Sequence, residues 1–154
     1  MESAITVGTS GEREAAPGGG SSFRRAVQLA LEAADADERV GPKIKATGIR
    51  MRWRFTDSGL VLDLAASEDP GRSIDWSFGG EADWKPKLEL AMDEAVANRY
   101  LQGQESLPIA IARGKVSVRA ESDFALRYLP ASRLLCEPYS RVVRERFPRL
   151  ATDG

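Results

Sequence analysis

The 154-residue chain contains no histidine. This absence excludes the Ser-His and Cys-His pairs that activate nucleophiles in many hydrolases, and it excludes zinc sites built with imidazole. Cys136 is the single cysteine, so the chain can form neither an internal disulfide nor a thiolate cluster. The sequence therefore favours a protein that is not an enzyme and has no catalytic residues, no metal and no cofactor.

Long apolar runs and an excess of charge are lacking as well. No apolar stretch is long enough to span a bilayer, and residues 1–21 do not have the basic start and apolar core of a secretory signal. We therefore expect a soluble, cytoplasmic protein. Lys and Arg number 22 and Asp and Glu 23, a net charge of −1. A dedicated nucleic-acid-binding domain is usually strongly basic, so we expect no nucleic-acid partner.

The chain is about the size of one domain. Residues 1–21 are rich in Gly, Ser, Ala and Glu and have little to bury, which predicts a flexible tail. Residues 22–148 are predicted to form a single domain, and residues 149–154 a flexible C-terminus. Hydrophobic residues make up 42% of the sequence, which is typical of a globular protein.

Alternating and turn-bounded segments predict strands, and the first three are joined by short turns into an antiparallel meander. The predicted strands cover approximately 43–56, 60–66, 72–78, 86–92 and 115–120. Apolar residues at helical spacing predict helices between and around them. These begin at Ser21 or Ser22, after Asp93, after Ser106 and after Ser122, and the last ends at Pro130. A further helix over about 131–147 is expected to be interrupted near Pro138. The segregated pattern predicts an α+β fold with one sheet and helices on a face.

The stretch Ile49–Phe55 reads IRMRWRF, with arginines and apolar residues in alternation. Because successive side chains of a strand face opposite ways, its apolar residues are predicted to face the helices and its arginines the other side. Asp63 and Asp75 on the neighbouring strands then fall on the arginine face. We expect exposed ion pairs there, each worth about 0–1 kcal/mol.

Two longer blocks carry a resemblance to a known family. PKLELAMDEAVANRYLQGQ, residues 86–104, combines an apolar strand, an acidic cap and a glycine-terminated helix. LPIAIARGKVSVRAESDFALRYLP, residues 107–130, combines a helix, a Gly-Lys with alternating apolar residues, and an acidic cap before a leucine-bearing helix. With the upstream hairpin FTDSGLVLDL, residues 55–64, the chain resembles the type 2 sterol carrier protein domain.

The resemblance implies a five-stranded, mainly antiparallel sheet covered on one face by helices, with an apolar tunnel between the two layers. The expected function is non-catalytic binding or transfer of a hydrophobic ligand: a sterol, fatty acyl chain, acyl thioester or phospholipid. Tyr100 and Tyr139 are candidate polar anchors. The candidate wall residues are Trp53, Leu64, Trp76, Leu90, Met92, Tyr100, Ile109, Phe124, Leu129, Leu135 and Tyr139.

Two alternatives stay open on the sequence alone. The core can be filled, and the chain then acts as a module for a transient membrane or protein partner, for which the C-terminal helix offers an excess of arginines over glutamates. Paired carboxylates in turns, Glu81 with Asp83 and Glu68 with Asp69, are the candidates for acid–base chemistry in a cavity enzyme. A solvated surface is the favoured interpretation of these carboxylates. The sequence does not predict an oligomeric state.

Overall fold

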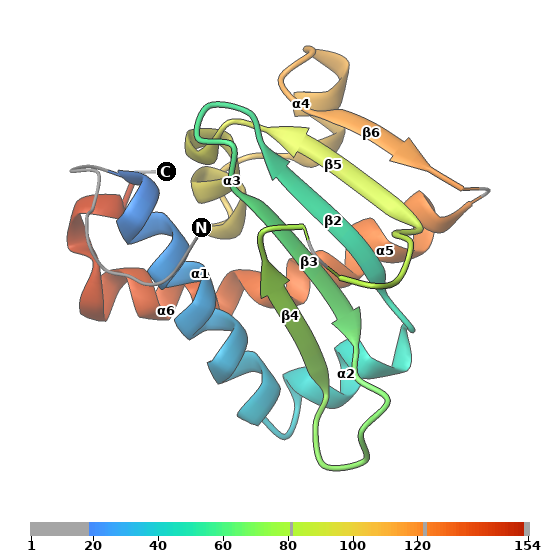
Figure 1. The fold of residues 1–154 in the computed structure, drawn as a ribbon. Helices are drawn as coiled ribbons and strands as arrows, with labels where there is room; N and C mark the ends of the chain where they lie inside the picture. Colours follow the sequence, from blue (N-terminus) through green and yellow to red (C-terminus); the bar gives the residue numbers. More distant parts are fainter. Residues whose placement is uncertain (1–18, 81, 122, 153–154) are drawn as a thin grey trace.

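The computed structural model describes residues 19–80, 82–121 and 123–152, so most of the predicted tail at 1–21 lies outside the described residues. Helices and strands follow one another along the chain as drawn in Figure 1. The elements are α1 (Gly19–Ala36), α2 (Val40–Ala46), β2 (Arg50–Phe55), β3 (Val61–Ala66), β4 (Ile74–Phe78), β5 (Leu88–Met92), α3 (Glu94–Leu101), α4 (Leu107–Ala112), β6 (Ser117–Ala120), α5 (Phe124–Ser132), α6 (Cys136–Arg146) and two 3₁₀ turns, η1 (Arg133–Leu135) and η2 (Pro148–Leu150).

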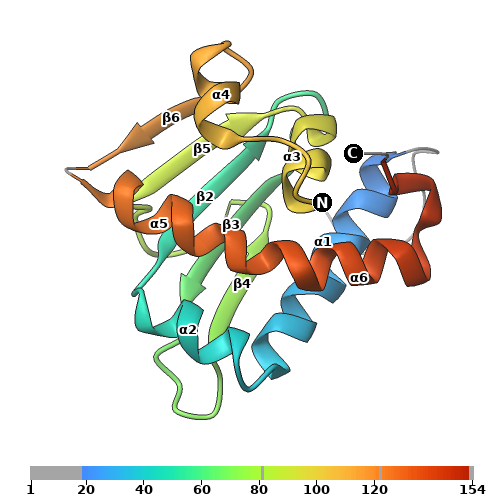
Figure 2. The same cartoon turned by 180° about the vertical axis from the view of Figure 1, so that it is seen from behind.

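The sheet has five strands in the order β4-β3-β2-β5-β6. Strands β2, β3 and β4 form the predicted antiparallel meander, and β6 pairs antiparallel with β5. Strand β5 runs parallel to β2, because the chain leaves the β4 edge and returns on the far side of β2. The predicted α+β class with a mainly antiparallel sheet is confirmed. Figure 2 shows α5 crossing the covered face of this sheet, while α6 continues past the β4 edge and packs against α1.

One predicted strand was wrong in its first half. Residues 43–56 were expected to be extended, but Val40–Ala46 form helix α2 and only Arg50–Phe55 form a strand. The carboxylate of Asp37 accepts the N–H groups of Arg39 and Val40, and these bonds hold the pKa of Asp37 below its ordinary value. These bonds satisfy backbone N–H groups at the start of α2, where the N-cap residue Arg39 makes no side-chain capping bond. The proline of α2 lies in its first turn, where it is tolerated.

A close approach also fixes the position of α2. A Cβ atom on Gly41 would lie 2.8 Å from Oγ of Ser73 and 2.9 Å from the carbonyl oxygen of Ala34. Only glycine therefore lets α2 pack this tightly between α1 and the β3–β4 connection. Ile44, in the next turn, is 1% exposed and anchors the helix to the core.

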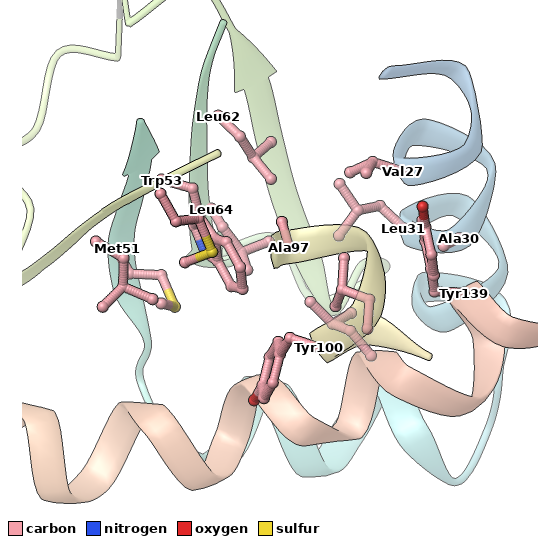
Figure 3. Close-up of a cluster of buried hydrophobic side chains, with 14 of the residues drawn as sticks. Val27, Ala30, Leu31, Met51, Trp53, Leu62, Leu64, Ala97, Tyr100 and Tyr139 are labelled. Atoms are coloured by element: carbon pink, nitrogen blue, oxygen red, sulfur yellow. The ribbon is translucent and has the colours of Figure 1, made fainter. Parts of the chain in front are cut away.

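The apolar face of the sheet forms the core as predicted from the alternation. Met51, Trp53 and Phe55 of β2 are at most 2% exposed. Their partners in register are leucines or Met92, so three neighbouring strands present one continuous apolar surface. Figure 3 shows this surface meeting side chains of α1, α3 and α6.

The opposite face differs from the expectation of exposed ion pairs in two respects. Arg52 and Asp63 form a two-point ion pair with an Nε–Oδ1 distance of 2.6 Å, and the Asp63 side chain is 1% exposed. The connection between β4 and β5 passes over this pair, and the N–H of Ala82 donates to Asp63. Asp75 lies on the predicted face but pairs with Arg72 instead of an arginine of β2.

Helix ends also differ from several expectations. Helix α1 begins at Gly19, before the predicted start at Ser21 or Ser22. Pro130 does not end α5, which continues to Ser132 with the proline inside it. The interruption of the C-terminal helix lies at η1, before Pro138, and Pro138 occupies the first turn of α6. At α3, Asp93 occupies the predicted cap position, but the carboxylate of Asp57 accepts the N–H of Glu94. The predicted cap at Ser106 is confirmed, because its hydroxyl accepts the N–H of Ile109.

Candidate ligand-binding site

An apolar cavity lies between the sheet and the helices, and it is small. Its volume of about 20 Å³ is close to the space of one water molecule. None of the described residues that line it carries a charged side chain. The lining residues come from α1, β2, β3, α3, η1 and α6: Val27, Ala30, Leu31, Trp53, Phe55, Leu62, Leu101, Leu135 and Tyr139.

A larger cleft of about 640 Å³ opens at the surface beside the end of α3. This volume falls in the range of pockets that hold small organic molecules. The leucines and prolines at 107–108 and 129–130 supply apolar walls, and Arg133 adds a cation at the rim. The lining residues are Tyr100, Gly103, Gln104, Glu105, Ser106, Leu107, Pro108, Leu129, Pro130, Arg133 and Cys136.

The cavity and the cleft are lined by neighbouring residues of the same two segments. Tyr100 lines the cleft, and its neighbour Leu101 lines the cavity; Cys136 lines the cleft, and its neighbour Leu135 lines the cavity. Two short segments, 100–101 and 135–136, therefore separate the two spaces, and we call them the partition. A sulfur–carbonyl contact of 3.5 Å joins them, from Cys136 Sγ to the Tyr100 oxygen.

Tyr100 is held in the partition from both ends. Its ring packs against Trp53, with centroids 6.2 Å apart. Its hydroxyl points toward α5 in Figure 3 and lies 2.6 Å from Oγ of Ser132, which donates in turn to the carbonyl oxygen of Leu129. Burial raises the pKa of Tyr100 to about 12, so this hydroxyl is neutral at physiological pH.

Trp53 carries a buried hydrogen-bond donor that the described residues leave unsatisfied. Its side chain lines the cavity and is 2% exposed, and its Nε1 has no partner among the described residues. A buried donor without a partner costs about 1–3 kcal/mol. The surface of the cavity itself is apolar throughout, so this unpaired N–H lies in the packed core and does not open into the cavity.

At the other end of the cavity, Tyr139 is bound into a polar network. Its hydroxyl donates to Oδ1 of Asn98 at 2.7 Å, and Nδ2 of Asn98 donates to the carbonyl oxygen of Leu150. Burial, and then the nearby charge of Glu94, raises the pKa of Tyr139. The pKa of Glu94 is itself raised by burial, and its Oε2 atom, like Nε1 of Trp53, is buried and finds no partner within the part of the chain that the structure describes.

Five of the predicted wall residues line the two spaces. Trp53, Leu135 and Tyr139 line the cavity, whereas Tyr100 and Leu129 line the cleft. The polar anchors predicted from the sequence, Tyr100 and Tyr139, are both engaged in hydrogen bonds within the protein. That these residues bind a ligand stays a prediction.

The other six lie elsewhere. Three are fully buried in the core and line neither the cavity nor the cleft: Leu64, Leu90 and Met92. Trp76 and Phe124 are partly buried against the core, and arginine side chains lie over both rings. Ile109 is 50% exposed on α4.

The sequence prediction missed the wall supplied by α1. Val27, Ala30 and Leu31 line the cavity, although none was among the candidates. The signal was present, because the apolar residues of this helix repeat at spacings of three and four. That spacing identified a buried helix face, but not the space it encloses.

The turn carboxylates that were candidates for acid–base chemistry do not form a buried cluster among the described residues. Asp83, Glu68 and Asp69 are exposed, and Glu81 lies outside the described residues. Within the described part of the chain, no group of three or more metal-binding side chains forms a candidate metal site. The helices of this part include none with the length and hydrophobicity needed to cross a membrane.

Comparison with known proteins identifies the architecture. No family model and no curated protein matches the sequence. Solved structures do match: the solution structure of sterol carrier protein domain 2 of Helicoverpa armigera has a TM-score of 0.54 and 14% identity, over 80% of this chain and 96% of that one. A crystal structure of sterol carrier protein 2 has a TM-score of 0.53 and 16% identity, over 75% and 94%.

The chain has the sterol carrier protein 2 fold. The resemblance expected from the sequence is therefore confirmed at the level of architecture. The fold also matches part of a larger enzyme, the sec-alkylsulfatase Pisa1 from Pseudomonas sp., with a TM-score of 0.49 and 16% identity. The match covers 71% of this chain but spans only 14% of that enzyme.

Proposed function

We propose that this chain binds a hydrophobic ligand, a sterol or an acyl lipid, without chemical change. One observation carries the proposal: an uncharged apolar cavity lies one layer of side chains away from a surface cleft of about 640 Å³. The sterol carrier protein 2 fold supports the same function, because the solved structures of this fold are named as sterol carriers.

The ligand enters through the cleft and displaces the partition. A cavity of about 20 Å³ is far too small for a sterol or an acyl chain, so uptake requires the side chains of Tyr100 and Leu135 to move. Burial of apolar ligand surface supplies about 25 cal/mol per Å² toward this rearrangement. The opposing costs are the lost packing of the partition and the hydrogen bond from Tyr100 to Ser132.

Native mass spectrometry with solvent extraction tests the proposal. The protein as purified is expected to carry a stoichiometric adduct that extracts as a lipid, or to acquire one from a panel of sterols and fatty acyl compounds. A clean apo mass, with no binding across the panel, would contradict the proposal.

A matched pair of variants tests whether the ligand enters through the cleft. Leu129→Gln introduces an amide into the wall of the cleft and is expected to weaken binding about tenfold or more. Ile109→Gln makes a comparable change on α4 outside the cleft and is expected to leave the affinity within about twofold. Circular dichroism confirms the fold of both. Equal effects of the two substitutions would exclude the cleft as the entry.

A second candidate function is a module that docks on an anionic membrane or protein. The small cavity favours it, since a core this nearly filled needs no ligand. Arg144 and Arg146 of α6 and Arg149 of η2 are exposed, and their charges outnumber those of the nearby Glu137 and Glu145. Sedimentation with anionic vesicles tests this function, which requires binding that falls with salt and with lower anionic lipid content.

A further inference from the structure

The surface cleft beside the end of α3 has an unbalanced charge. Among the described residues that line it, Glu105 and Arg133 are the charged ones. The carboxylate of Glu105 accepts two N–H groups of Arg99, at 3.2 and 2.8 Å, and these bonds hold the pKa of Glu105 below its ordinary value. Arg133 is exposed and takes part in none of the ion pairs among the described residues. The cleft is therefore left with one cation that no carboxylate of the described chain neutralises.

The charge of Arg133 acts on other groups that line the cleft. Burial raises the pKa of the Cys136 thiol, and the nearby charge of Arg133 opposes part of that rise. The same charge acts on the hydroxyl of Tyr100, whose pKa burial raises to about 12. Because such interactions weaken with distance, the guanidinium group lies near the partition and not on a remote part of the surface.

The walls of the cleft suit an apolar chain. Leu107 and Pro108 of α4 line it together with Leu129 and Pro130 of α5. Contact with these side chains removes apolar ligand surface from water, which contributes about 25 cal/mol per Å². A ligand in the cleft therefore meets apolar walls and an unpaired cation together.

This combination favours an anionic amphiphile over a neutral lipid. A guanidinium group presents planar N–H donors that match two oxygens of a carboxylate or a phosphate, and such charge-assisted hydrogen bonds are stronger than neutral ones. A neutral head group gains nothing from the charge. Because Arg133 is exposed at the rim, a bound anion keeps part of its hydration and avoids the full cost of burying a charge.

We propose that Arg133 is a specificity-determining residue that binds the anionic head group of an amphiphile, a long-chain carboxylate or an alkyl phosphate, whose apolar chain lies along the walls of the cleft. The preferred ligand is then an anion and not a neutral sterol. The inference rests on the proposed function and deepens it by naming the chemistry of the ligand's outer end.

Three probes with the same chain length test the proposal: decanoate, decyl phosphate and decanol. Their dissociation constants are measured by isothermal titration calorimetry on the full chain at low salt and at about pH 8, where both acids are ionised. The decanol-to-anion ratio of dissociation constants is compared between the wild type and Arg133→Gln. For at least one of the two anions, the ratio is expected to fall about 3- to 10-fold in the variant, and that anion names the head group.

Two further variants separate a local charge from a general one. Arg144→Gln removes an exposed arginine of α6 that lines neither the cleft nor the cavity, and it is expected to leave both ratios unchanged. Arg133→Lys keeps the charge and is expected to retain part of the preference for the anion. Added salt is expected to weaken the binding of the anions but not that of decanol. Circular dichroism verifies that each variant is folded.

Three outcomes would overturn the proposal while leaving lipid binding intact. Ratios that are the same in the wild type and Arg133→Gln would mean that Arg133 does not meet the head group. Equal falls in Arg133→Gln and Arg144→Gln would make the preference a property of net charge. Tighter binding of decanol than of either anion by the wild type would show that the site prefers a neutral lipid. If none of the three probes binds the wild type, the proposed function itself fails.

Discussion

The two faces of β2 differ in whether their polar side-chain groups have partners. On the outer face, each arginine has a carboxylate partner: Arg50 pairs with Glu68, Arg52 with Asp63 and Arg54 with Glu89. On the inner face, the side chains are apolar, and the one polar atom that β2 contributes, Nε1 of Trp53, has no partner among the described residues.

This difference lies in whether the chain itself supplies a partner for each polar group of the strand. The outer face satisfies its charges within the chain, so its arginines are not a free basic surface for a nucleic-acid backbone. The absence of a nucleic-acid partner stays a prediction. The inner face leaves one donor unsatisfied among the described residues and one small apolar space unfilled.

The largest expected effect is on the inner face. Leu64→Ala removes a side chain that is fully buried, and the free energy of unfolding is expected to fall by about 2–5 kcal/mol. Urea denaturation measures the loss. Ile109→Ala, at a half-exposed position, is the control and is expected to cost much less. Equal losses would mean that the inner face is not the stabilising core.

Alkaline pH is expected to destabilise the helical layer that covers the inner face, because it ionises the buried tyrosines of α3, α5 and α6. Burial raises the pKa of Tyr100 to about 12 and also raises those of Tyr128 and Tyr139. A raised folded-state pKa means that the stabilisation is complete below the unfolded value of about 10 and is lost as the pH rises toward 12. For Tyr100 the loss amounts to roughly 2–3 kcal/mol at pH 12.

Tyrosinate absorbance near 295 nm checks this prediction. We expect little signal at pH 10, followed by a steep rise that coincides with unfolding followed by circular dichroism. Tyr100→Phe removes one tyrosine and is expected to reduce the amplitude and delay unfolding. Three gradual titrations centred near pH 10 in the folded protein would show that these hydroxyls are not buried.

A smaller effect is expected at the buried Arg52–Asp63 ion pair of the outer face. Asp63→Asn keeps the shape of the side chain and removes the charge opposite Arg52, and it is expected to cost about 1–3 kcal/mol. A double-mutant cycle with Arg52→Met isolates the pairwise energy. A coupling energy near zero would show that the pair contributes nothing despite its burial.

The smallest effect is expected at the exposed end of the same strand. Arg54 pairs with Glu89, but its side chain is 50% exposed. Arg54→Ala is expected to change the free energy of unfolding by about 0–1 kcal/mol, and the change should vanish at high salt. Thermal unfolding at low and high salt measures it. A larger, salt-independent loss would place Arg54 with Arg52 as part of a buried network.

Much of the architecture was predictable from local pattern. The alternation in Arg50–Phe55 placed the apolar residues inside and the arginines outside, and the three-strand meander followed from its turns. Helix α2 was not predicted, because its capping depends on Asp37 and its packing on Gly41 approaching Ser73, a contact between residues far apart in the chain.

The candidate site was predictable only in part. The sequence indicated that Trp53, Leu135 and Tyr139 are apolar wall residues, but Leu64 and Leu90 show the same alternation and line neither space. Periodicity identifies which way a side chain points, and it is the same for a packed core and for the wall of a cavity.

By itself, the sequence determined which side chains are inside, because the period of two in the strands and the spacing of three and four in the helices decide which face is buried. The tertiary structure alone decided where packing is incomplete. A small cavity, a partition of two short segments and an unpaired Trp53 N–H depend on how α1, α3 and α6 meet over the sheet. Such contacts join residues distant in sequence, and no local pattern records their distances.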